Sequence, residues 1–134
     1  MYQAGTLSGN PVAMAVGIAM LEELGKPGVY EELARKGAAL EKGLSEAFAE
    51  AEVPARVNRV GSLLTVFFTG DPVSDMDSAS ATDRDKFARF FHAIVAEGVY
   101  PPPSQFEAWF VSLAHTDQDI AKTITAAKRA LATL

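Results

Sequence analysis

The stretch Arg56–Phe68, RVNRVGSLLTVFF, decides which kind of fold this chain adopts. Polar and apolar residues alternate over Arg56–Val60, which is typical of a half-buried strand. Leu63–Phe68 is apolar and rich in β-branched and aromatic residues, as strands are. Gly61 and Ser62 lie between the two runs and indicate a bulge or a bend. The stretch therefore predicts two strands in succession.

Two helices are expected before these strands. Asn10 is a good N-cap and Pro11 a good first helical residue, so a helix is predicted over residues 11–24. Its first eleven positions carry no charge, which predicts burial nearly all round and indicates a partner surface outside this chain. The second helix, Gly28–Ala51, is amphipathic and has oppositely charged residues four apart, namely Glu31–Arg35, Glu32–Lys36 and Lys42–Glu46.

The region after the strands predicts a loop, two helices and two short strands. Residues 69–82 predict a surface loop. A helix follows, with Thr82 and Asp85 as its capping box and Gly98 at its end. Short strands are expected at residues 99–100 and 109–114, and Thr116 and Asp119 open a last helix. The order of all elements favours an α+β domain, with a small, largely antiparallel sheet covered on one face by helices.

Length, charge and cysteine content narrow the class of protein. The 134 residues suit one domain, and a hydrophobic fraction of 49% excludes a disordered chain. The net charge is −5 and no basic stripe is present, so nucleic acid is not an expected partner. The most apolar run, residues 11–21, is shorter than the ~20 residues that a membrane span needs. The chain has no cysteine, which fits a reducing compartment.

The opening loop is the first candidate site. Gly5, Thr6, Ser8 and Gly9 offer hydroxyls and unhindered backbone N–H groups just before a helix N-terminus. Such a combination can receive a phosphate, because amide dipoles and hydroxyl donors both favour an anion. Ordinary turn chemistry is the alternative for the same residues.

The second candidate site follows three consecutive prolines at residues 101–103. Proline stiffens the backbone, so this segment can present Ser104, Gln105 and Glu107 in a fixed shape. The Glu107 carboxylate has aromatic neighbours in sequence and is expected to be partly desolvated. A surface loop with a salt-bridged glutamate is the alternative.

No pattern is typical of a metal site. The two histidines, His92 and His115, lack the paired spacing of zinc ligands, and cysteine is absent. We expect His92 on the solvated surface and His115 as a local hydrogen-bonding residue. The aspartates of residues 71–77 lack the glycine and the distal glutamate of an EF-hand.

Three stretches closely resemble the glutamate-1-semialdehyde 2,1-aminomutase family, a group of pyridoxal-phosphate enzymes among the class III aminotransferases. They are YQAGTLSGNPVAMA (Tyr2–Ala15), VNRVGSLLTVFF (Val57–Phe68) and PPSQFEAWFVSLAHT (Pro102–Thr116). The resemblance covers essentially the whole chain, but only the C-terminal third of the family. Within these stretches, GTLSGNP and PSQFEA distinguish the aminomutases from ordinary transaminases.

The resemblance implies a type I PLP-dependent fold and a homodimer with active sites at the subunit interface. It implies that Gly5 and Thr6 lie on a loop that reaches the neighbouring subunit's site and helps to hold the phosphate of pyridoxal or pyridoxamine 5′-phosphate. Glu107 is implied to lie near cofactor and substrate. The family converts glutamate-1-semialdehyde into 5-aminolevulinate for tetrapyrrole (porphyrin) biosynthesis, in the cytoplasm or, in plants and algae, the plastid stroma.

One departure from the family decides what the chain can do alone. The family's Schiff-base lysine precedes the YQAGT motif and is absent here, and all six lysines lie on or beside amphipathic helices rather than in a desolvated, cofactor-facing setting. We therefore expect a C-terminal domain with no catalytic residue of its own and no activity by itself. Residues 1–25 would lead out of the missing large domain, and the uncovered helix should drive self-association.

Two alternatives stay open. The chain is also compatible with a fragment of another class III aminotransferase of different specificity. A stand-alone α+β module that binds a phosphorylated ligand at the loop of residues 5–10 is the second alternative.

Overall fold

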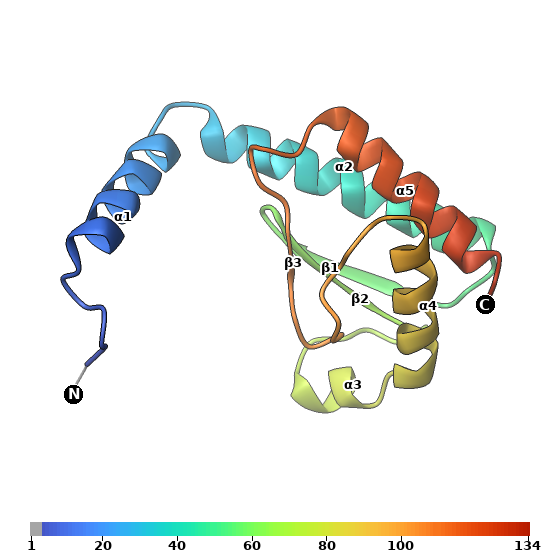
Figure 1. The fold of residues 1–134 in the computed structure, drawn as a ribbon. Coiled ribbons are helices and arrows are strands. Elements are labelled where there is room, and N and C mark those ends of the chain that lie inside the picture. Colours follow the sequence, from blue (N-terminus) through green and yellow to red (C-terminus); the bar gives the residue numbers. More distant parts are fainter. Residues whose placement is uncertain (1–3) are drawn as a thin grey trace.

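The computed structural model describes residues 4–134, so Tyr2 of the opening motif and the start of the predicted segment 1–25 lie outside the described residues. The elements in chain order are α1 (Pro11–Leu24), α2 (Val29–Glu50), β1 (Arg56–Val60), β2 (Leu63–Phe67), α3 (Met76–Ser80), α4 (Arg84–Ala96), β3 (Trp109–Phe110) and α5 (Asp117–Leu131) (Figure 1).

The three strands form an antiparallel sheet in the order β1-β2-β3. Val60 pairs with Leu63, so Gly61 and Ser62 form a tight hairpin turn rather than a bulge. Gly61 has a φ of 60°, which is the conformation that a two-residue hairpin needs and that glycine adopts most readily. The predicted pair of strands is confirmed, with this turn as its link.

Helices α2, α4 and α5 cover one face of the sheet, as predicted (Figure 1). Leu64 and Val66 alternate toward this face, where they are buried under the helices. Phe48 of α2 and Phe90 of α4 meet Phe68 at ring-centroid distances of 5.5 Å each. This aromatic cluster joins α2, α4 and the end of β2 into one core, which confirms the predicted α+β layer.

Three details between β2 and α5 differ from the prediction. Asp75 caps a short helix, α3, within the expected loop, because its carboxylate accepts from the Ser78 N–H at 2.8 Å. Residues 99–100 are not a strand, and the strand expected over residues 109–114 is confined to β3. In β3, Trp109 and Phe110 pair with Leu64 and Leu63 of β2.

The helix α4 is capped by Asp83, not by Thr82 as predicted. The Asp83 carboxylate accepts from the Lys86 N–H at 2.8 Å. Thr82 is buried, and its hydroxyl donates to the Ala79 carbonyl oxygen at 2.8 Å. A buried hydroxyl needs a hydrogen-bond partner within the protein. Thr82, which the sequence spacing favours as the cap, therefore bonds inside the fold and does not cap α4.

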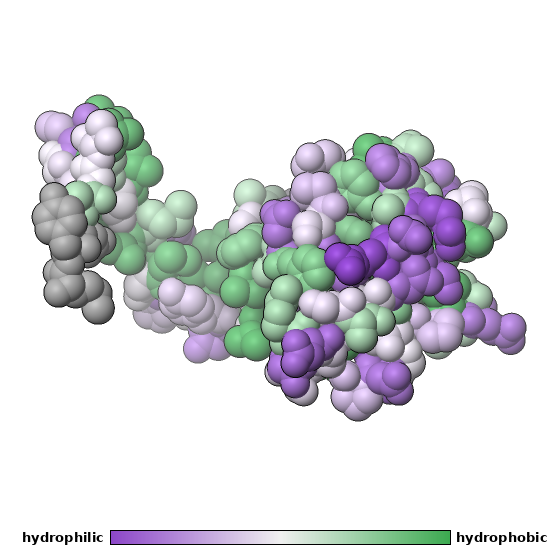
Figure 2. All heavy atoms as spheres, turned by 90° about the horizontal axis from the view of Figure 1, so that it is seen from below, coloured by the Kyte–Doolittle hydropathy of each residue, from purple (hydrophilic) through white to green (hydrophobic). Residues whose placement is uncertain are grey.

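Helix α1 extends away from the rest of the molecule (Figure 1). Its caps are as predicted, with Asn10 at the start and Gly25 at the end. None of its residues is buried, so the prediction of burial nearly all round is wrong within this chain. Figure 2 shows apolar residues gathered along this helix, Val12 and Leu21 among them at 72% and 71% exposure. The partner surface that the prediction required is not supplied by residues 4–134.

Candidate functional site

The loop before α1 is held in a tight turn. The Ser8 N–H donates to the Gly5 carbonyl oxygen and the Asn10 N–H to that of Leu7, each at 3.0 Å. A Cβ atom at Gly5 would lie 2.8 Å from the Ser8 Oγ, so a side chain there would displace the Ser8 hydroxyl. Thr6 follows on the exposed side, and the loop therefore presents its hydroxyl and backbone donors outward.

The N-terminus of α1 is not available as an anion site. The Asn10 Oδ1 accepts from the N–H groups of Val12 and Ala13, both at 3.1 Å. The expectation that the helix end contributes to phosphate binding is therefore wrong, because a side chain already uses those donors. What remains for a phosphate is the hydroxyls of Thr6 and Ser8 and the loop's other N–H groups, such as that of Gly9. These residues fit one side of a phosphate, and the loop carries no Lys or Arg, so further donors must come from elsewhere.

The second predicted site lies on a turn between α4 and β3. The Glu107 N–H donates to the Ser104 carbonyl oxygen at 3.1 Å, and the Phe106 N–H donates to the Ser104 Oγ at 3.2 Å. Gln105 is only 2% exposed, so it is not presented at the surface as predicted. Glu107 is exposed and forms no ion pair within residues 4–134, so neither the desolvated nor the salt-bridged carboxylate is found.

This turn borders the sheet face that the helices leave open. An open hollow of about 350 Å³ is lined in part by Asn58, Thr65 and Phe106. A second hollow of about 540 Å³ shares Asn58 and Thr65 and extends to Ala108. The turn therefore stands at the rim of a recessed, partly apolar surface, which is a suitable wall for a ligand site.

The structure does not bring the two predicted sites together. Figure 1 shows the loop before α1 at the far end of that helix, which points away from the sheet, whereas the segment between α4 and β3 belongs to the packed body. Gly5 and Thr6 therefore share no site with Glu107 within one chain.

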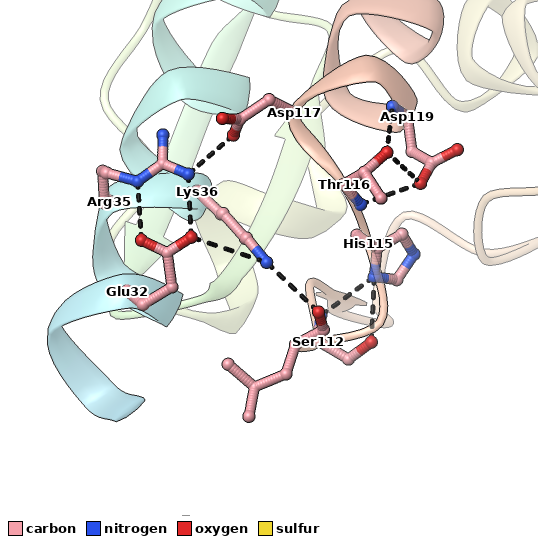
Figure 3. A network of polar contacts seen from close by, with 9 residues as sticks. Glu32, Arg35, Lys36, Ser112, His115, Thr116, Asp117 and Asp119 are labelled. Atoms are coloured by element: carbon pink, nitrogen blue, oxygen red, sulfur yellow. Dashed lines mark hydrogen bonds and ion pairs between the residues drawn. The ribbon is translucent and has the colours of Figure 1, made fainter. Parts of the chain in front are cut away.

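Lys36 is a desolvated lysine, but its ammonium group is already bound within the fold. It is only 7% exposed. Its Nζ donates to the Leu113 carbonyl oxygen at 3.2 Å and lies 3.6 Å from the Glu32 carboxylate (Figure 3). Arg35 pairs with Glu32 at 2.7 Å and with Asp117 at 2.6 Å. The Lys36 ammonium thus ties α2 to the segment before α5, which gives it a structural role.

The histidines are placed as predicted. The His115 Nδ1 accepts from the Ser112 N–H at 3.0 Å (Figure 3), and His92 is exposed. In the part of the chain that the structure describes, no group of acidic and histidine side chains is arranged to hold a metal ion.

No helix described here is both long and apolar enough to cross a bilayer.

Comparison with known proteins decides the family. The model of the family "Aminotransferase class-III" matches residues 2–131. The chain belongs to the class-III aminotransferase family. The glutamate-1-semialdehyde 2,1-aminomutase of Desulfatibacillum aliphaticivorans is 53% identical to this class-III chain over 131 residues, which are 98% of the chain and 31% of that protein. The enzyme of the same name from Anaeromyxobacter sp. (strain K) is 56% identical over 132 residues, 98% of the chain and 30% of that protein.

Solved structures agree on the class-III fold. The crystal structure of a glutamate-1-semialdehyde-aminomutase from Pseudomonas aeruginosa PAO1, in complex with PMP, matches 98% of this chain and 30% of that chain. Its TM-score is 0.85 and its sequence identity 20%, so it establishes the fold alone. The class-III chain spans about a third of the length of the curated relatives that it matches.

Proposed function

We propose that this chain is the C-terminal portion of a glutamate-1-semialdehyde 2,1-aminomutase, the enzyme that isomerises glutamate-1-semialdehyde to 5-aminolevulinate. The observation that carries the proposal is the identity of 53% to 56% to curated aminomutases over 98% of the chain. The chain alone is inactive on this proposal, and the reaction needs the part of the relatives that it does not span. The compartment that suits this role is the cytoplasm, or the plastid stroma in a plant or alga.

The cofactor of the proposed enzyme is pyridoxal or pyridoxamine 5′-phosphate, which when bound acts as the electron sink for chemistry at an amino-bearing carbon. Gly5 and Thr6 suit its phosphate, because both residues are exposed and Gly5 has no side chain to cover the neighbouring backbone N–H groups. A hydroxyl and N–H groups that bond a phosphate form charge-assisted hydrogen bonds. Glu107 lies between Phe106 and Ala108, which line the two hollows of the open sheet face, and it is exposed and without an ion pair in the described residues, so its carboxylate is available to a bound substrate.

The proposal includes a homodimer, which the separation of these residues supports. The loop of Gly5 and Thr6 lies beyond the projecting helix α1, whereas the turn of Glu107 belongs to the packed body (Figure 1). A second subunit that receives the α1 end of the first can unite the two halves of a site. This arrangement supports the proposal that the loop serves the neighbouring subunit.

A transaminase with an external keto-acid acceptor is the second candidate. The family model alone favours it, because that model describes aminotransferases in general. The named relatives at higher identity favour the aminomutase.

One experiment separates these functions. This chain replaces the matching 132-residue segment in the Anaeromyxobacter sp. (strain K) enzyme, and the purified hybrid is given glutamate-1-semialdehyde. We expect 5-aminolevulinate without any added keto acid. Transfer to an added keto acid in its place would support the transaminase, and no turnover by a folded hybrid that retains its cofactor would contradict both functions.

A further inference from the structure

Gln105 is a buried polar residue for which the proposed function has no role. Its Nε2 donates to the Thr82 Oγ1 at 2.8 Å and to the Ala79 carbonyl oxygen at 3.1 Å. The Thr82 hydroxyl donates in turn to the same carbonyl oxygen at 2.8 Å. The three groups form a closed network under the corner between α3 and α4.

This network anchors the turn that carries Glu107. The turn lies in a segment without regular secondary structure, yet it is held on two sides. Gln105 ties it to the α3–α4 corner, and the Thr65 hydroxyl of β2 donates to the Glu107 carbonyl oxygen at 3.3 Å. The backbone of Glu107 is therefore fixed while its carboxylate is exposed.

Stability alone does not account for the carboxamide of Gln105. Its Oε1 is buried and has no hydrogen-bond partner among the described residues. An unpaired buried acceptor is unfavourable, and an apolar side chain of similar size would avoid that cost. The amide is thus better explained by the two bonds that its Nε2 makes than by packing.

We propose that Gln105 is a positioning residue for Glu107. Its carboxamide holds the turn of residues 104–107 so that the Glu107 carboxylate keeps one position between Phe106 and Ala108, which line the hollows of the open sheet face. The inference rests on the proposed function, in which Glu107 lies near cofactor and substrate.

The test uses the hybrid aminomutase described above. Gln105→Leu removes both hydrogen bonds at similar volume and is expected to lower kcat about tenfold or more, because small displacements of a functional group are costly to the rate. Ile94→Val, a matched core change in α4 at a fully buried position, is expected to leave kcat unchanged. In a Glu107→Gln background, Gln105→Leu should add less than about twofold, since the two residues act as one unit. Full additivity, or an unchanged kcat for Gln105→Leu, would overturn the inference.

A second pair of variants and a readout without activity complete the test. Thr82→Val removes the hydroxyl that Gln105 bonds, and Thr82→Ser keeps it. Hydrogen exchange at the Phe106 and Glu107 amides of the 134-residue chain should accelerate at least about threefold in Thr82→Val and Gln105→Leu, but not in Thr82→Ser. Equal exchange in all variants would refute the anchoring. If the unmodified hybrid is inactive, the proposed function fails, and the exchange data still decide whether Gln105 fixes the turn.

Discussion

At the scale of single residues, the ion pairs of Arg35 link α2 to α5 and shift the pKa values of the groups involved. Hydrogen bonding by the Arg35 guanidinium lowers the pKa of the Glu32 carboxyl from 4.5 to about 2, and Glu32 in turn raises the pKa of Arg35. Arg35 also bonds Asp117 at 2.6 Å. One cation thus serves carboxylates from two helices far apart in the sequence.

This network predicts how acid destabilises the chain. Because the pKa of Glu32 is lower in the folded chain, its ionised form stabilises the fold above about pH 4.5, and this stabilisation disappears as the pH falls toward 2. Arg35→Met should lower the urea midpoint of unfolding at pH 7. It should also reduce the further loss of stability between pH 4.5 and 2.5. Arg129→Met, which removes a cation paired with Glu97 at 3.1 Å instead, is the matched control and should keep the acid-dependent loss.

At the scale of elements, the sequence predicted what depends on neighbours along the chain. The Asn10 cap of α1 and the capping box of Thr116 and Asp119 were predictable because each bond spans two or three residues. The burial of Lys36 was not predictable, because its partner carbonyl belongs to Leu113, far along the chain. The cap of α4 also spans three residues, but it was assigned to the neighbouring Thr82, because the tertiary contact of that hydroxyl with Gln105 is not visible in the sequence.

The packing of α2 on the hairpin turn predicts the effect of a small substitution. A Cβ at Gly37 would lie 2.5 Å from the Gly61 carbonyl oxygen and 3.1 Å from the Ser62 Cα. Gly37→Ala should therefore destabilise the chain by about 1–3 kcal/mol, although alanine favours a helix by about 1 kcal/mol. Urea unfolding followed by circular dichroism measures this.

Gly17→Ala in α1 is the control for this substitution. Among the described residues, a Cβ at Gly17 would meet no atom within 4 Å. It should leave stability equal or higher, and an equal loss for both variants would contradict the close contact between α2 and the turn.

At the scale of the whole molecule, the chain combines a packed α+β body with an exposed apolar helix. The bounds of α1 were predicted correctly, but its burial was not, because the absence of charge predicts contact with protein and does not say which protein. The two predicted sites are likewise separated because α1 does not pack on the body of the same chain. Glu107 belongs to the body, and Thr6 precedes the helix that leaves it (Figure 1).

The exposed helix predicts that the chain self-associates. Large exposed apolar surfaces drive association, and Val12 and Val16 are 72% and 61% exposed. Sedimentation velocity should show a sedimentation coefficient that rises with concentration in the micromolar range. The double variant Val12→Glu, Val16→Glu should abolish the rise, whereas Tyr30→Glu, an exposed position on α2, should not. A monomer at all concentrations would contradict this role for α1.

The most direct measurement is the rate of 5-aminolevulinate formation by the hybrid enzyme, with the 134-residue chain alone measured beside it. We expect the hybrid to convert glutamate-1-semialdehyde without an added amino acceptor, and we expect no conversion by the chain alone. Turnover by the chain alone, or a folded hybrid that binds pyridoxamine phosphate but forms no 5-aminolevulinate, would contradict it.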